Sequence, residues 1–102
     1  MEKRTPHYAL GDIQRQMQSV ADLYLTRSAQ QGMRLARMSE AEALRVIQGL
    51  DRRCFYKSMT TYADHRVWQD VYHAAYRGRA LYLKFQKTDE YFVVSFKERG
   101  DG

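Results

Sequence analysis

The spacing of apolar residues changes near Cys54, and this change constrains the fold more than any other feature of the chain. Before Cys54, apolar residues recur every three or four positions, which is typical of amphipathic helices. From Leu81 to Phe96 they alternate with polar residues, which is typical of strands with one buried face. Helices followed by antiparallel strands predict an α+β fold, with N-terminal helices packed on one face of a C-terminal sheet. The opposite face is then open to solvent and to a partner.

Two helices are expected in the first third of the chain. The first has about three turns, with Asp12 contributing to its cap, and its apolar face comprises Leu10, Ile13, Met17 and Val20. The second is expected to run from Ser28 to about Arg37, because Ser28 and Gln31 have capping-box spacing. Residues 23–25 between the two helices are expected to form a short extended piece.

A third helix is indicated by the same capping-box spacing between Ser39 and Glu42. Its inward residues are expected to be Ala43, Leu44, Ile47 and Leu50. Gly49 lies near its end, where glycine favours a left-handed cap.

Four strands are predicted after Cys54. The stretch from Cys54 to Tyr72 contains neither proline nor glycine, and it predicts two strands joined by a polar corner at residues 63–65. Gly78 interrupts the pattern, and a polar turn at residues 87–90 separates the last two strands. The predicted strands are residues 55–62, 67–72, 81–86 and 91–97.

The length of 102 residues predicts a single domain spanning residues 1–102. No apolar run approaches the roughly 18 residues that a membrane-spanning helix needs. The polar start Met1-Glu2-Lys3-Arg4 shows no signal peptide. Cys54 is the one cysteine and has no partner for an internal disulfide, so a reducing cytoplasm is the expected location.

The net charge of +5 is concentrated in the second half of the chain. Residues 52–102 hold ten lysines and arginines against six acidic residues, whereas residues 1–51 hold seven against six. This asymmetry favours an anionic partner, of which nucleic acid is the commonest. The alternative is that the charge serves only solubility, as in many small domains.

No metal or cofactor site is predicted. The three histidines lack ligand spacing, and the lone Cys54 cannot provide a pair of thiolates. Cys54 at the start of a strand is expected to be a small buried residue rather than a nucleophile.

Tyrosines and basic residues crowd the predicted sheet, with six of the eight tyrosines between Tyr56 and Tyr91. Basic groups hold phosphates and aromatic rings stack on unpaired bases, although about half of these tyrosines are expected only to seal the sheet. The candidate RNA-binding residues are Tyr56, Arg77, Arg79, Lys84 and Lys97.

Such a surface also offers the groups for metal-free RNA cleavage, in which the 2′-hydroxyl attacks the adjacent phosphate. That reaction needs a base, hydrogen-bond donors for the phosphorane oxygens and an acid for the leaving oxygen. A lysine among other cations has a lowered pKa and can act as base, while tyrosine and glutamine can donate to phosphate. The candidates are Lys57, Gln69, Tyr82 and Lys97. The alternative for each lysine is a solvated side chain without a role.

Several motifs resemble the toxins of the motility quorum-sensing regulator family, MqsR. The most specific are Phe-Tyr-Lys-Ser-Met-Thr-Thr-Tyr at residues 55–62 and Trp-Gln-Asp-Val-Tyr at residues 68–72. The start of the chain, Tyr-Leu-Lys at residues 82–84 and Val-Ser-Phe-Lys at residues 94–97 are similar as well.

The resemblance implies a RelE-like ribonuclease fold and the activity of a type II toxin that cleaves messenger RNA, preferring short sites that begin with GC. The family's active-site lysine, glutamine and tyrosine correspond to Lys57, Gln69 and Tyr82, and a lysine near its C-terminus corresponds to Lys97. The sequence departs from the family pattern at residues 73–79, a segment expected to be a loop.

The resemblance also implies a cognate antitoxin that has a zinc-binding N-terminal part and a helix-turn-helix C-terminal part. Zinc belongs to this partner, and operator DNA is contacted only through the complex. Two other functions remain as alternatives: a nucleic-acid-binding module without catalysis, and a corepressor that depends on the antitoxin.

Overall fold

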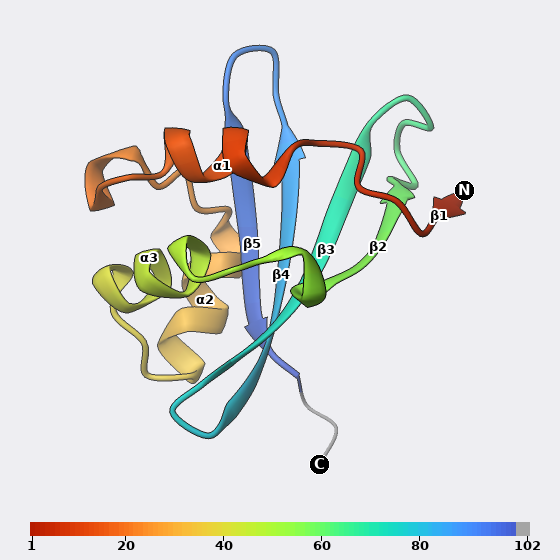
Figure 1. Cartoon of the computed structure of the whole chain (residues 1–102). Helices are drawn as coiled ribbons and strands as arrows, with labels where there is room; N and C mark the ends of the chain where they lie inside the picture. Colours follow the sequence, from red (N-terminus) through yellow and green to blue (C-terminus); the bar gives the residue numbers. More distant parts are fainter. Residues whose placement is uncertain (100–102) are drawn as a thin grey trace.

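The computed structural model describes residues 1–99, which form three α-helices and one five-stranded sheet (Figure 1). In chain order the elements are β1 (Glu2–Lys3), α1 (Leu10–Gln16), α2 (Arg27–Leu35), α3 (Glu40–Gln48), β2 (Phe55–Thr60), β3 (Trp68–Tyr76), β4 (Arg79–Lys87) and β5 (Phe92–Glu98). The strands lie in the order of the sequence, and each pairs antiparallel with its neighbour. This confirms the predicted α+β fold. Residues 100–102 of the predicted domain lie outside the described part of the chain.

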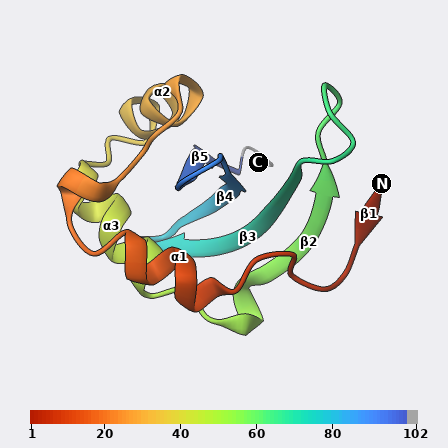
Figure 2. The same ribbon diagram turned by 90° about the horizontal axis from the view of Figure 1, so that it is seen from above.

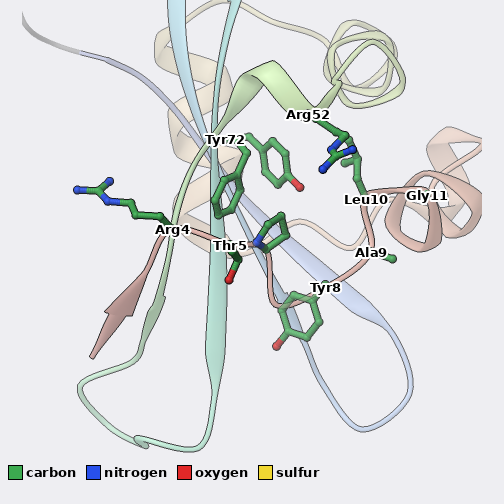
Figure 3. A pocket seen from close by; sticks show the side chains of 10 residues that line it. Arg4, Thr5, Tyr8, Ala9, Leu10, Gly11, Arg52 and Tyr72 are labelled. Atoms are coloured by element: carbon green, nitrogen blue, oxygen red, sulfur yellow. The ribbon is translucent and has the colours of Figure 1, made fainter.

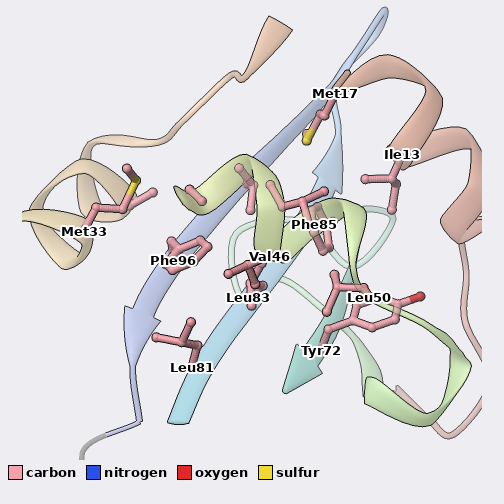
Figure 4. Close-up of a cluster of buried hydrophobic side chains, with 14 of the residues drawn as sticks. Ile13, Met17, Met33, Val46, Leu50, Tyr72, Leu81, Leu83, Phe85 and Phe96 are labelled. Carbon is pink, nitrogen blue, oxygen red and sulfur yellow. The ribbon is translucent and has the colours of Figure 1, made fainter. Parts of the chain in front are cut away.

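The sheet is curved and has two different faces, because buried and partly exposed residues alternate along its strands (Figure 2). On β4, Leu81, Leu83 and Phe85 are fully buried against the helices. Figure 4 shows Leu83 and Phe85 packed with Val46 of α3 and with side chains of the α1 region. We call the other side the open face; it includes Lys57, Gln69, Val71, His73, Tyr82, Lys84, Gln86, Ser95 and Lys97.

The three helices do not all cover the same face of the sheet. α1 and α3 cover the buried face, whereas α2 packs along β5 at the edge of the sheet (Figure 2). The segment before α2 also bonds to β5, because Val94 donates to the carbonyl oxygen of Tyr24 and accepts from the amide of Thr26. This extended piece confirms the expectation for residues 23–25, and it covers the outer edge of β5.

The first helix is shorter than predicted. α1 ends at Gln16, and Val20 begins a separate 3₁₀ turn that ends at Asp22. The carbonyl oxygen of Met17 accepts from the side chain of Gln48 at 2.6 Å, so a tertiary contact replaces the next helical hydrogen bond. The expected cap at Asp12 is also wrong, because Ala9 is the capping residue and no side chain caps the helix.

Of the two capping boxes predicted from the sequence, at Ser28 and at Ser39, the structure contains only the second. The capping box of Ser39 and Glu42 is present at the start of α3, as predicted. The predicted box at Ser28 is wrong, because the hydroxyl of Thr26 accepts from the amide of Ala29 and starts the helix two residues earlier. Gly49 is not left-handed, since its φ is −88°.

Two strand boundaries also differ from the prediction. β2 ends at Thr60, because the Thr61 hydroxyl bonds the backbone of Asp64 and closes the corner. β3 continues beyond Tyr72 to Tyr76, so the predicted loop at residues 73–79 is mostly strand. The turn itself comprises Arg77 and Gly78, whose φ values of 51° and 78° suit a two-residue hairpin that follows the sheet twist.

The N-terminal segment is fixed to the sheet by a buried carboxylate. Asp70 and Ser58 are fully buried, and Ser58 donates to Asp70 at 2.6 Å. The backbone amides of His7 and Tyr8 also donate to Asp70, at 3.0 Å and 2.9 Å. Lys3 lies 4.3 Å from the centre of the Trp68 ring. These contacts place β1 beside β2, whereas this segment was expected only as a polar lead-in.

In the described part of the chain, no helix combines the length and the apolar character that a membrane crossing requires.

Substituting Gly32 tests the packing of α2. A Cβ at Gly32 would overlap the carbonyl oxygen of Phe96 and lie 3.1 Å from the Cα of Lys97. Both neighbours are backbone, so α2 must move away from β5. We expect Gly32→Ala to lower the free energy of unfolding by about 1–3 kcal/mol.

The matched control is Gly11→Ala in α1, where the added Cβ would meet only the end of the Arg15 side chain, at 3.4 Å. Alanine favours helix over glycine by about 0.5–1 kcal/mol, so this variant is expected to be as stable as the wild type or more stable. Urea unfolding measures both. A Gly32→Ala protein as stable as Gly11→Ala would contradict the close packing.

Candidate active site

The sheet brings together the three residues that the sequence singled out as catalytic candidates. Lys57 lies on β2, Gln69 on β3 and Tyr82 on β4, all on the open face. Lys57 is opposite Val71, which is opposite Lys84 on β4. Gln69, Lys57 and Tyr82 thus occupy three consecutive rows of the open face, which we call the cluster, although its members are up to 25 residues apart in the sequence.

Two of the predicted RNA-binding lysines join the same face. In the register, Tyr82 is opposite Lys97, and Lys84 is opposite Ser95. The Lys97 Nζ atom lies 5.2 Å from the centre of the Tyr82 ring. A hollow of about 220 Å³ opens here, lined by Ser28, Tyr82, Lys84, Ser95, Phe96 and Lys97. Its size and its two lysines suit a phosphate group with part of its sugar.

A bulge in β2 turns two consecutive side chains toward the open face. The register passes from Phe55 opposite Tyr72 to Lys57 opposite Val71, which leaves Tyr56 as the extra residue. Phe55 packs on the buried face, while Tyr56 stacks on His73 of the open face with ring centres 4.3 Å apart. Tyr56 is 42% exposed, and the Arg4 guanidinium and the Lys57 Nζ atom lie 5.6 Å and 5.5 Å from its ring centre. An exposed tyrosine ring beside cations suits stacking on a base next to a phosphate.

His73 belongs to this cluster and was missed by the sequence analysis. It stacks on Tyr56, and its ring centre lies 5.8 Å from that of Tyr82, the residue opposite it on β4. Burial lowers the pKa of His73 below its ordinary value of 6.5, with a further contribution from Arg99. The sequence signal that could have identified His73 is its spacing, since Gln69, Val71 and His73 are every second residue of one strand. This spacing is recognised only when β3 is extended past Tyr72.

Lys57 is held as a cation. Its Nζ atom lies 2.8 Å from the Glu2 Oε2 atom, and its side chain is only 20% exposed. The hydrogen bond to Glu2 raises the pKa of Lys57, and burial opposes this effect without reversing it. The expectation of a lowered pKa for a basic lysine is therefore wrong at Lys57. The N-terminal strand, whose carboxylate the sequence analysis did not assign to the site, is the cause.

The neighbouring groups differ in their electrostatics. Burial lowers the pKa of Lys84, and the charge of Lys97 adds to this effect. Burial raises the pKa of Tyr82, although the charge of Lys57 counteracts it. At neutral pH the site therefore combines a protonated phenol with a lysine cation fixed by Glu2.

Gln69 is oriented by a partner on the next strand. Its Nε2 atom donates to the Oε1 atom of Gln86 at 2.9 Å. Because each amide group has two N–H donors, the Gln69 amide keeps a second donor for a ligand.

Two predicted RNA-binding residues lie away from this cluster. Arg77 pairs with Glu42 of α3 at 3.0 Å, and Arg79 pairs with Glu98 at 3.3 Å. Both arginines line a hollow against the helices at the end of the β3–β4 hairpin. The structure thus does not bring them to the open face, and their part in RNA binding stays a prediction.

A cavity of about 540 Å³ also lies away from the cluster (Figure 3). Phe55 and Tyr72 of the buried face line it, together with the N-terminal segment and the side chains of Arg4 and Arg52. Within residues 1–99, no group of three or more histidine, cysteine, aspartate or glutamate side chains is arranged to hold a metal ion.

Comparison with known proteins supports the resemblance seen in the motifs. The profile of the family described as "Motility quorum-sensing regulator, toxin of MqsA" matches residues 5–98. The chain is also 39% identical over 99 residues to the mRNA interferase toxin MqsR of Escherichia coli strain K12, an alignment that covers 97% of this chain and all of the relative. The chain therefore belongs to the MqsR toxin family.

Proposed function

We propose that this protein is an endoribonuclease toxin that cleaves messenger RNA and thereby stops translation and growth. The observation that carries the proposal is the convergence of Lys57, Gln69 and Tyr82 on one uncovered face of the sheet. Membership of the MqsR family and a relative named as an mRNA interferase toxin support it.

Each residue of the cluster has a role suited to its environment. Lys57, held as a cation by Glu2, stabilises the negative charge that develops on the phosphate. The Gln69 amide donates a hydrogen bond to a phosphate oxygen. Tyr82, whose phenol stays protonated at neutral pH, gives its proton to the leaving 5′-oxygen.

Other residues of the open face bind the RNA on either side of the reacting phosphate. Lys84 and Lys97 line the hollow beside Tyr82 and attract neighbouring phosphates. Tyr56 stacks on an unpaired base through its exposed side. We further propose that cleavage needs no metal ion and prefers short sites beginning with GC.

Two alternatives predict different behaviour of the same surface. A non-catalytic nucleic-acid-binding module would bind RNA through its basic and aromatic residues without breaking it. A corepressor would act on operator DNA, as part of a complex with the antitoxin. This role is compatible with toxin activity of the free protein.

Removing the three candidate groups tests the catalytic role of the cluster. Loss of one donor to a developing oxyanion reduces rates about 10²–10³-fold in comparable sites. We expect this loss for Lys57→Ala, Gln69→Ala and Tyr82→Ala. Tyr82→Phe should lose the same activity, because it removes the hydroxyl group; activity kept by Tyr82→Phe would indicate that the ring acts by stacking. Because groups that act as one unit do not add, the triple variant is expected to be little slower than the slowest single variant. Single-turnover cleavage of a defined RNA measures these rates.

The matched controls are Lys87→Ala and Tyr91→Phe, which change the same residue types at the far β4–β5 turn. Both are expected to cleave at the wild-type rate, and circular dichroism checks the fold of every variant. A folded Lys57→Ala protein that cleaves like the wild type would remove this cluster from consideration.

The reaction products and the effect of a chelator test the chemistry. Attack by the 2′-hydroxyl leaves 2′,3′-cyclic phosphate and 5′-hydroxyl ends, and a substrate with a 2′-deoxy sugar at the cleaved position must remain intact. EDTA is expected to leave the rate unchanged. Loss of cleavage in EDTA that is restored by a divalent ion would contradict the metal-free mechanism, whereas RNA binding without new ends would favour the non-catalytic module.

The implied partner gives a further test. We propose a cognate antitoxin with a zinc-binding N-terminal part and a helix-turn-helix C-terminal part. Its expression should restore the growth of cells that produce this toxin, and the two proteins should co-purify. If the protein is toxic and no neighbouring gene product suppresses the toxicity or binds it, the assignment to a two-protein toxin–antitoxin pair is wrong.

A further inference from the structure

Cleavage by a 2′-hydroxyl requires a proton acceptor, and neither Lys57, Tyr82 nor Glu2 suits this role. Lys57 is held as a cation by Glu2, and the Tyr82 phenol keeps its proton at neutral pH. Glu2 accepts the Lys57 proton in a hydrogen bond that lowers the pKa of its carboxyl group, which makes it a weak base. Lys57, Gln69 and Tyr82 thus supply charge and donors but no base suited to neutral pH.

The imidazole of His73 occupies the place where such a base is needed. One face of its ring is stacked on Tyr56 at 4.3 Å with an angle of 20° between the planes, and the ring centre of Tyr82 lies 5.8 Å away. The Lys57 Nζ atom lies 5.5 Å from the centre of the same Tyr56 ring. His73 therefore contacts the same Tyr56 ring that lies beside the Lys57 cation, and it lies opposite the proposed acid, Tyr82.

The nitrogens of His73 are available to a substrate. The side chain is partly exposed on the open face, and within residues 1–99 neither ring nitrogen makes a hydrogen bond. His7, in contrast, bonds to Lys3 and stacks on Trp68 at the opposite side of the sheet, and His65 lies in the β2–β3 corner. Stacking on Tyr56 fixes the plane of the His73 ring, so its edge is presented in one orientation.

We propose that His73 is the general base of the cleavage reaction. This inference rests on the proposed function and adds a residue to it. A ring nitrogen of His73 takes the proton of the 2′-hydroxyl as the 2′-oxygen bonds to phosphorus. The bond from phosphorus to the 5′-oxygen breaks, and the leaving oxygen takes the phenolic proton of Tyr82. The imidazolium then loses its proton and the phenolate regains one through solvent, which restores both groups.

The charged neighbours of His73 decide how the reaction depends on pH. They are Tyr56 and Lys57 of β2, Tyr82 and Lys84 of β4, Lys97 of β5, Glu2 and Arg4 of the N-terminal segment, and Arg99. Burial lowers the pKa of His73 below 6.5, and the charge of Arg99 acts in the same direction. Below that pKa the imidazole is protonated and cannot accept a proton, and above it the base is ready.

The pH profile of kcat/KM, which reports groups of the free enzyme, tests this directly. In the wild type we expect kcat/KM to rise with pH through a midpoint below 6.5 and then to stay level to about pH 8. His73→Gln should reduce kcat/KM at pH 7 by about 10²–10³-fold and abolish the rise. The matched control His65→Gln should keep both the rate and the rise.

A rescue experiment separates catalysis from a structural role. In His73→Gly, free imidazole can enter the space between Tyr56 and Tyr82 and is expected to restore part of the cleavage rate. It should restore nothing in Lys57→Ala, and the affinity of His73→Gly for uncleavable 2′-deoxy RNA should stay within about threefold of the wild type.

The outcomes distinguish this inference from the proposed function. If wild-type protein does not cleave RNA, the proposed function itself fails. If it cleaves without an acidic limb below pH 6.5, or if His73→Gln keeps the wild-type rate and limb, His73 is not the base and the function stands. Because the wild-type profile alone can overturn the inference, the test does not depend on whether a variant folds.

Discussion

The buried carboxylate of Asp70 is the contact on which the arrangement of this protein depends. It lies on the helix side of β3, inaccessible to solvent, and receives hydrogen bonds from Ser58 of β2 and from the amides of His7 and Tyr8. A buried donor left without a partner costs about 1–3 kcal/mol, so three such donors hold the N-terminal segment firmly against the sheet. The segment in turn places Glu2 beside Lys57. A carboxylate on one side of the sheet thereby positions the partner that raises the pKa of a lysine on the other side.

The open face illustrates how a sheet assembles a site from weakly interacting parts. Neighbouring strands place lysine, glutamine, tyrosine and histidine in adjacent rows, and their long side chains pack over Val71, which is fully buried although it lies on the open face. The lysines differ in their surroundings: Glu2 stabilises the charge of Lys57, while burial and the nearby charge of Lys97 disfavour the charge of Lys84. An RNA phosphate would offset the repulsion between the Lys84 and Lys97 charges, so this part of the open face favours binding of an anion.

The sequence predicts the type and order of the main elements because periodicity is a local property. It predicts boundaries poorly where two local signals compete, as at Thr26 and Ser28, since tertiary contacts with β5 favour the earlier cap. The motif residues Lys57, Gln69 and Tyr82 lie on one face, but the pKa of Lys57 depends on β1, a strand of two residues without any pattern. His73 was overlooked for a related reason. Its strand extends through two alanines, which carry little strand signal, and pairing with β4 makes this segment a strand.

The bulge at Tyr56 has a consequence for the kinds of genetic change this fold can survive. Along β2, β3 and β4, buried core residues alternate with residues of the open face. A substitution on one face can therefore change the stability or the surface of the site without changing the other. Insertions and deletions have no such freedom. Loss of a single codon elsewhere in β2 would shift the register and turn the following side chains to the opposite face. At the bulge itself, loss of Tyr56 would restore regular pairing and remove the ring that stacks on His73. Length changes should therefore accumulate in the corner between β2 and β3, and the strands should diverge by substitution alone.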